Sequence, residues 1–179
     1  MTQRKPITRR LASTDGAEIA EAALVLPLVF MLLLGTVWFG RAFNIYSTIQ
    51  QAAQQGAITA ARSTCGTCGN FNAADATVVK TIKAVMQASS IDPAQIPVNT
   101  NAPAPTFCTP PPPDGACKTT GNITICRNAL LNPTAGKTQP QQCGVIVSFQ
   151  YPFQFYLPFT SLNMQKIILS AQAQSRMEN

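Results

Sequence analysis

The chain has 179 residues, of which 46% are hydrophobic and only 11% are charged. Soluble globular proteins average about 25% charged residues, so the composition argues against an ordinary soluble enzyme of this size. The formal net charge is +6, but four basic residues among the first ten (Arg4, Lys5, Arg9 and Arg10) account for most of it. The remaining basic residues are scattered rather than gathered into a patch, so we expect no nucleic-acid partner.

A short basic leader opens the chain and ends at a glycine. It reads MTQRKPITRRLASTDG over residues 1–16, and Ala17 and Glu21 stand between it and an apolar run. Two physical roles are open for Glu21. Its carboxylate suits the level of the lipid headgroups, and it also suits the start of a helix, where negative charge interacts favourably with the helix dipole.

Residues 22–39 form an uncharged run, AALVLPLVFMLLLGTVWF. This is close to the roughly 20 apolar residues that a membrane-spanning helix needs. Basic residues gather before the run and only Arg41 stands just after it, so the positive-inside bias predicts a cytoplasmic N-terminus. A cleaved secretory signal is the alternative, but its apolar region is usually about 7–15 residues long and a cleavage site follows closely. The longer run, which continues into helix-forming sequence, favours a retained anchor.

The same helix is expected to continue outside the membrane to about residue 62. Five apolar or small residues recur at steps of three to four and so share one face: Ile45, Ile49, Ala52, Gly56 and Ala60. Small residues allow another helix or sheet to approach closely. We expect this face to cover the protein's own head, and the alternative is a packing surface shared between subunits of a filament.

All six cysteines follow the apolar run: Cys65, Cys68, Cys108, Cys117, Cys126 and Cys143. An even number confined to one side of a membrane predicts disulfides in an oxidising compartment, with the pairing left open. A zinc site is the competing interpretation, but the chain has no histidine and lacks a second CxxC. A redox centre would place its CxxC at the start of a helix after a strand, whereas Cys65 and Cys68 follow a helix.

A second helix is predicted from residue 73 to about residue 90. Asn72 can cap it, Asp75 lies in its first turn, and one face is apolar, with Val78, Val79, Ile82, Val85 and Met86. The segment 92–113 then carries eight prolines, which predicts an irregular or polyproline loop. We expect a surface loop pinned by Cys108 and Cys117, with a recognition epitope for a proline-binding groove as the alternative.

Strands are predicted in the C-terminal half. Residues 122–127 are short and β-prone, and residues 145–153 and 167–177 alternate with a period of two, which predicts half-buried strands. Pro152 indicates an edge or a bend in the second of these. The fold class is therefore α+β: a long transmembrane helix carries a small disulfide-stapled head, residues 63–179, of one helix packed on an antiparallel sheet.

Residues that could carry catalysis are missing from this pattern. There is no histidine and no phosphate-binding glycine loop, and the acids Asp75, Asp92 and Asp114 are isolated in the sequence. We expect a protein that is not an enzyme and that uses no cofactor or metal.

The N-terminal quarter of the chain resembles a known family. Gly16, four residues, Glu21 and then an apolar helix are similar to the processing site of type IV pilin precursors. The stretch EAALVLP from Glu21, the pair Gly40-Arg41 and the sequence AQQGAITAAR over residues 53–62 resemble the TadE-like pseudopilins of tight-adherence (Tad) pilus systems. Ile58 stands where that family more usually has arginine. The pilin-like plan of a long helix and an α+β head agrees with the predicted elements.

The resemblance implies that a prepilin peptidase cleaves between Gly16 and Ala17, so that Glu21 becomes the fifth mature residue. Glu21 would then neutralise the N-terminal amine of a neighbouring subunit, because an unpaired charge in a bilayer costs several kcal/mol. The implied protein is a minor pilin or pseudopilin in the inner membrane, with an exported head, and its partners are other pilins and the assembly machinery. The alternative is a single-pass surface-binding or adhesion module that is neither processed nor polymerised.

Overall fold

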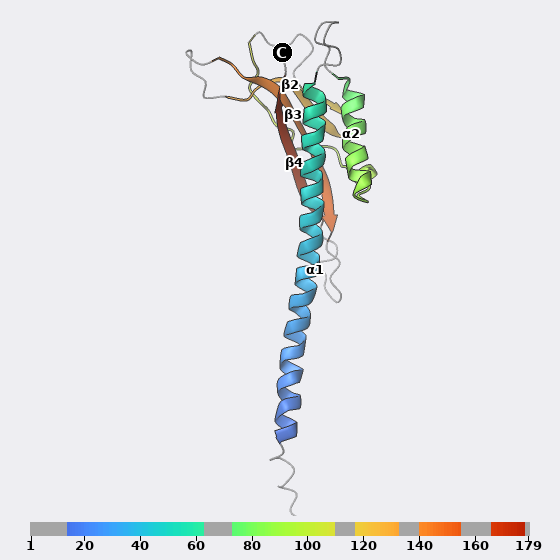
Figure 1. Ribbon diagram of the computed structural model, residues 1–179, viewed down its shortest axis with the longest axis vertical. Helices are drawn as coiled ribbons and strands as arrows, with labels where there is room; N and C mark the ends of the chain where they lie inside the picture. Colours follow the sequence, from blue (N-terminus) through green and yellow to red (C-terminus); the bar gives the residue numbers. More distant parts are fainter. Residues whose placement is uncertain (1–13, 63–72, 110–116, 133–139, 155–165, 178–179) are drawn as a thin grey trace, which may run out of the picture. The chain divides into compact units, whose positions relative to one another are not determined.

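The computed structural model describes residues 14–62, 73–109, 117–132, 140–154 and 166–177. In chain order the elements are α1 (Thr14–Ala61), α2 (Asp75–Ala88), the 3-10 helix η2 (Pro93–Gln95), β1 (Cys117–Thr120), β2 (Ile123–Leu130), β3 (Cys143–Gln154) and β4 (Lys166–Arg176) (Figure 1). The predicted α+β class, with a long N-terminal helix and an antiparallel sheet, is confirmed. The chain divides into two compact units, Met1–Arg41 and Ala42–Asn179.

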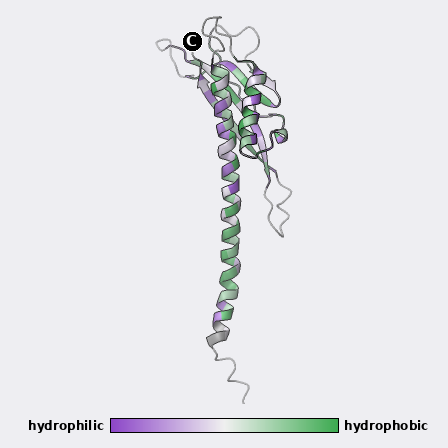
Figure 2. Ribbon diagram, turned by 45° about the vertical axis from the view of Figure 1, so that its right-hand side comes forward, coloured by the Kyte–Doolittle hydropathy of each residue, from purple (hydrophilic) through white to green (hydrophobic). Residues whose placement is uncertain are grey.

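The described part of the first unit is the N-terminal portion of α1, which carries the apolar run (Figure 2). The helix begins at Thr14, three residues before the expected start at residue 17. Pro27 lies inside the helix without ending it, although it removes one backbone N–H donor. Local adjustment of the backbone can re-satisfy the freed carbonyl in a membrane.

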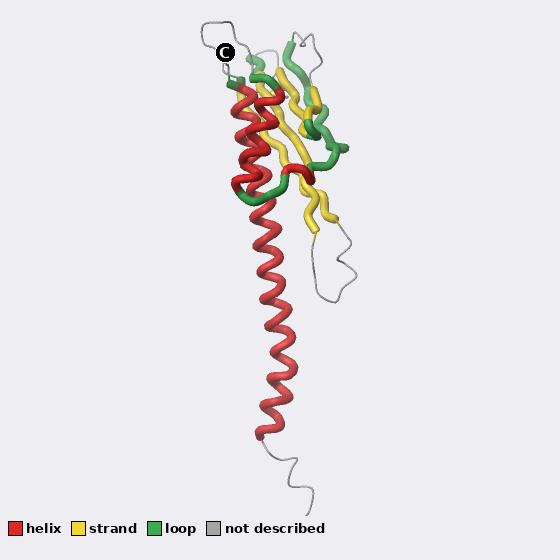
Figure 3. Tube along the Cα trace, turned by 90° about the vertical axis from the view of Figure 1, so that its right-hand side faces the viewer, coloured by secondary structure: helices red, strands yellow, loops and turns green. Residues whose placement is uncertain are grey.

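The second unit is built on a four-stranded antiparallel sheet in the order β1-β2-β3-β4. The outer part of α1, by which we mean residues 42–61, and the whole of α2 lie on one face of this sheet (Figure 3). They bury Ile49 and Ile82 against Val147 and Phe149 of β3. Full burial of one such side chain contributes about 1.5–3 kcal/mol, so this layer is the main hydrophobic core of the unit.

Helix α2 confirms the second predicted helix, with Val78, Val79, Ile82 and Met86 buried and Val85 partly buried. The predicted cap differs. Asn72 lies outside the described residues, and the N-cap position is Ala74, which makes no side-chain capping bond.

Strand β3 is buried on both faces, which corrects the prediction of a half-buried strand over 145–153. Ser148 and Gln150, expected on a solvent face, are as buried as their apolar neighbours. The reason is a third layer on the side of the sheet away from the helices. Strand β1 and the extension of β2 to Leu130 were also not predicted, because their short sequences do not alternate clearly.

The third layer is the described part of the proline-rich segment, residues 92–109 (Figure 3). The Asn99 side-chain amide donates hydrogen bonds to Thr124 Oγ1 at 3.2 Å and to Ser148 Oγ at 3.1 Å. The Asn122 side-chain amide donates to the Ile96 carbonyl at 2.8 Å. Phe107 forms a β-bridge with Ala129 of β2, beyond the position where Cys117 at the start of β1 faces Cys126. The segment is therefore not only a surface loop, since it covers one face of the sheet.

Candidate processing and assembly site

The three residues expected to direct processing lie in the first two turns of α1. Gly16 and Ala17 fall in its first turn, and the Glu21 side chain is exposed. A Cβ placed on Gly16 would meet no atom within 4 Å, so the surroundings do not require glycine there. Glycine lowers helix stability by about 1 kcal/mol relative to alanine, so Gly16 makes this turn easier to unwind.

Immediately after Glu21, α1 presents apolar side chains on every side. The large residues from Leu24 to Leu33 are all exposed, and none of the most apolar window is buried. This one helix is long and apolar enough to cross a membrane. The Thr36 hydroxyl donates to the Leu33 carbonyl at 2.8 Å, so this polar group is satisfied within the helix. At the other end of the run, the Arg41 guanidinium lies 5.7 Å from the centre of the Trp38 ring, in a cation–π contact.

The outer part of α1 buries the predicted face inside its own unit. Ile49, Ala52 and Ala60 are fully buried, and Ala53 and Ala57 join them beside the predicted line. The prediction that this face covers the protein's own head is confirmed. The alternative, that these residues form a packing surface shared between subunits, is wrong, because the face is already occupied.

Gly56 is the closest point of this contact. A Cβ built there would lie 2.6 Å from Cδ1 and Cγ1 of Ile82 on α2, and 3.6 Å from Cγ1 of Val147 on β3. Real Cβ atoms essentially never approach other heavy atoms this closely. Only glycine lets α1 approach the other elements at this distance without a shift of Ile82.

A polar cluster around Arg127 fixes the ends of both helices, and sequence reasoning missed it. Arg127 Nη1 donates to the Ala60 carbonyl at 3.0 Å, and Nη2 donates to the Ala73 carbonyl at 2.6 Å and to Asp75 Oδ1 at 2.8 Å. The last four carbonyls of a helix lack intrahelical partners, and a cation there also favours the dipole. Asp75 is therefore not isolated, which corrects the expectation from sequence.

A β-bulge interrupts β2 between Cys126 and Ala129, next to Arg127. Between β2 and β3 the register shifts, so that Cys126 faces Ile146 but Ala129 faces Gly144. Asn128 adopts φ of 56°, a left-handed conformation that asparagine tolerates better than most residues. Two residues of β2 thus oppose one of β3, as in a β-bulge. Ala129 then packs with Cys126 and Ile146, whereas Arg127 keeps the alternation that places Ile123 and Ile125 against the helices.

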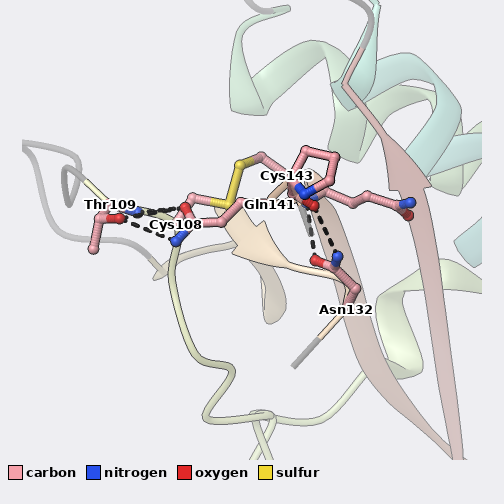
Figure 4. The surroundings of a disulfide bond; sticks show 7 residues. Cys108, Thr109, Asn132, Gln141 and Cys143 are labelled. Atoms are coloured by element: carbon pink, nitrogen blue, oxygen red, sulfur yellow. Dashed lines mark hydrogen bonds between the residues drawn. A yellow bond between two sulfur atoms is a disulfide. The ribbon is translucent and has the colours of Figure 1, made fainter. Parts of the chain in front are cut away.

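Two disulfides hold the proline-rich layer and the first hairpin. Cys108 bonds to Cys143 at the start of β3, and Cys117 bonds to Cys126 directly opposite it on β2. Cys108 and Cys117 are therefore not partners of each other. Cys65 and Cys68 lie outside the described residues. Figure 4 shows the surroundings of the first bond, where the Thr109 N–H donates to Gln141 Oε1 at 3.0 Å and the Gln142 N–H donates to Asn132 Oδ1 at 2.9 Å.

Comparison with known proteins places the family signal on the first helix. Residues 16–57 match the model of the family described as TadE-like protein. The matched segment begins at Gly16, includes Glu21 and the whole apolar run, and ends on the buried face of α1. No curated protein and no solved structure matches the chain significantly. Over these residues, the first helix is similar to TadE-like proteins, and the rest of the chain lies outside the match.

Proposed function

We propose that the protein is a minor pilin or pseudopilin that joins, primes or anchors a Tad-type pilus or a related secretion apparatus. Residues 1–16 are its leader, and residues 22–39 of α1 cross the inner membrane. The N-terminus lies in the cytoplasm and the head, residues 63–179, is exported together with the outer part of α1. Its partners are a prepilin peptidase, other pilins or pseudopilins, and the assembly machinery.

The observation that carries the proposal is the placement of Gly16 and Glu21 on one helix directly before the apolar run. Cleavage after Gly16 needs an extended backbone in the peptidase site, so the first turn of α1 has to unwind. Helix ends fray, and the first four N–H groups of a helix have no intrahelical acceptor. The low helix propensity of glycine supports this local unwinding.

Glu21 supplies the charge for assembly in this proposal. Its exposed carboxylate stands at the edge of the apolar run, where burial in lipid would cost several kcal/mol without a partner. Cleavage would create a new amine at Ala17, and the amine of a neighbouring subunit offers the opposite charge. Pairing of the two would let both charges enter the membrane or the filament core together.

A tethered head that is never polymerised is the second candidate. One observation favours it: the buried face of α1 is filled by the protein's own sheet and second helix, so this core needs no neighbouring subunit. In that case the helix acts as an anchor, and the exported head binds a surface or another molecule.

Mechanical shearing of surface filaments from intact cells separates the two candidates. A pilus subunit is expected in the sheared filaments beside the major pilin. A tethered module is expected to stay with the membranes. Absence from the filaments, with no loss of piliation after deletion of the chain, would contradict the role in pilus assembly.

A further inference from the structure

One end of the second unit carries exposed apolar residues that its core does not use. Among the described residues of this unit, six large apolar side chains are exposed: Phe43, Tyr46, Ile58, Val98, Ile167 and Ile168. Four of them gather at one end, on α1 and β4. Together with Lys166 they form what we call the base patch: Phe43, Tyr46, Lys166, Ile167 and Ile168.

The placement of the patch follows from one contact. Gln50 Nε2 on α1 donates to the Ser170 carbonyl on β4 at 3.3 Å, and the two elements run alongside each other (Figure 1). Phe43 lies seven residues before Gln50, which is about 10 Å along a helix. Ile167 lies three residues before Ser170, which is again about 10 Å along a strand. Phe43 and Ile167 are therefore level with each other.

Phe43 and Tyr46 also point to the side of α1 that meets β4. They precede Gln50 by seven and four residues, and residues at these spacings share one helix face. Phe43 is 72% exposed and Tyr46 is 44% exposed, so neither is covered by the strand. On β4, Ile167 is 45% exposed and Ile168 is 49% exposed, although they alternate across the sheet. The end of the unit is thus apolar on both faces of the strand.

This end is also where the chain leaves for the apolar run. The unit begins at Ala42, and the uncharged run ends at Phe39, three residues earlier. Because α1 is one helix through this point, Ala42 lies about 4.5 Å along the helix from Phe39. Phe43, the first residue of the base patch, follows Ala42 directly, so along the chain the patch begins just after the apolar run.

We infer that the base patch docks the head on the lipid surface from which α1 emerges, and that the lipids it fits are anionic phospholipids. The amphipathic ring of Tyr46 suits the headgroup region, Phe43 adds apolar surface, and a basic residue near an anionic surface is attracted to it. Lys166 supplies that charge. The only acids among the described residues of the unit, Asp75 and Asp92, lie outside the patch, bonded to Arg127 and to the Ala94 N–H. The docking rests on the membrane anchoring in the proposed function, but not on processing or pilus assembly.

Depth-dependent quenching of a tryptophan tests the docking on the full chain. Trp38 is the only tryptophan, so Trp38→Phe gives a background for a single reporter at Ile168→Trp. The matched control is Val98→Trp, because Val98 is 66% exposed and lies in the proline-rich layer away from the patch. The chains are reconstituted into phosphatidylglycerol vesicles that contain lipids brominated near the headgroup. Retention of the Cys108–Cys143 bond shows that each variant has folded.

We expect the reporter at residue 168 to shift to shorter emission wavelengths and to lose most of its fluorescence, while the reporter at residue 98 stays unquenched. Equal quenching of the two reporters would overturn the inference. An emission shift that disappears when the chains are diluted to one per vesicle would also overturn the inference. The patch would then bind a second copy of the chain rather than lipid. Lys166→Glu should reduce the quenching of the reporter at residue 168, whereas the control Lys80→Glu, on the exposed side of α2, should not. If Lys166→Glu has no effect, the assignment to anionic lipid is wrong. Cleavage and polymerisation do not enter this measurement, so its failure is distinct from a failure of the pilin function.

Discussion

Arg127 and Asp75 form an ion pair of 2.8 Å that joins strand β2 to the first turn of α2. The same guanidinium binds the last turn of α1 through the Ala60 carbonyl. One side chain thereby ties together the end of one helix, the start of the next and the sheet beneath them. Its three partners are Ala60, Ala73 and Asp75, and the segment that contains Cys65 and Cys68 lies between the first of them and the other two.

Replacement of Arg127 by alanine should destabilise the head. The Ala60 and Ala73 carbonyls and the Asp75 carboxylate would lose a charged donor, and such hydrogen bonds are worth about 1.5–3 kcal/mol each in favourable cases. The side chains of the pair are about one-quarter exposed, at 22% and 25%, so water replaces part of this loss. We expect a decrease of about 2 kcal/mol in the free energy of unfolding of the detergent-solubilised chain, measured by denaturant titration.

Two variants test whether the branched guanidinium group of Arg127 is needed or whether a positive charge is enough. Arg127→Lys keeps the cation but cannot reach three acceptors, so its stability should fall between the wild type and Arg127→Ala. Lys80→Ala, on the exposed side of α2, is the control and should change little. Equal stability of Arg127→Ala and wild type would show that the cluster does not hold the helices.

Substitution of Gly56 by alanine should also destabilise the head, against the usual trend for helices. Alanine is favoured over glycine inside a helix by about 1 kcal/mol. Here the added Cβ would lie 2.6 Å from Ile82, and overpacking of a core typically costs about 1–3 kcal/mol. We expect a lower melting temperature for Gly56→Ala and partial recovery in the double variant with Ile82→Val. Gly40→Ala, where a Cβ meets nothing within 4 Å, is the control and should not lower it.

The two disulfides should contribute unequally to stability. Cys108–Cys143 closes a loop with a sequence separation of 35, whereas Cys117–Cys126 closes one of 9. The loop-entropy relation then predicts a loss of about 4 kcal/mol for the first bond and about 2.5 kcal/mol for the second. Paired cysteine-to-serine variants, compared by denaturant titration without reductant, measure the difference. A larger loss for the short loop would contradict this account.

Asn99 should hold the proline-rich layer on the sheet. Its side-chain amide donates hydrogen bonds to Thr124 and Ser148, which are both buried. Replacement by alanine would remove this donor from the two hydroxyl acceptors. We expect the Asn99→Ala variant to be cleaved faster than the wild type within residues 96–105 under limited proteolysis, with no change in the cleavage of α2. Thr100→Ala is the neighbouring control, and an equal cleavage rate for both variants would argue against the role of Asn99.

Local patterns were sufficient for the helices, whereas processing at Gly16 stays a prediction. The steps from Ile49 to Ala60 predicted which face of α1 is buried, because the period of a helix is a local property. The spacing of Gly16 and Glu21 before an uncharged run is local too. Ala53 and Ala57 were missed because alanine is common on both buried and exposed faces.

Features that depend on contacts distant in sequence could not be predicted in this way. Burial of Ser148 and Gln150 results from the layer that includes Asn99, about 50 residues earlier. The contact of Arg127 with Asp75 joins residues that are 52 positions apart in the sequence. Register also brings Cys117 opposite Cys126, whereas six cysteines in a sequence leave the pairing open.

The central claim is that the chain enters the pilin pathway through cleavage between Gly16 and Ala17. The most direct measurement is the intact mass and N-terminal sequence of the membrane-extracted chain, from cells with and without an active prepilin peptidase. The account predicts a chain that begins at Ala17 only when the peptidase is active. Gly16→Leu and Glu21→Ala should abolish this start, while Glu18→Ala, which replaces the neighbouring exposed acid, should retain it. A chain that still begins at Met1 in cells with an active peptidase would contradict the account.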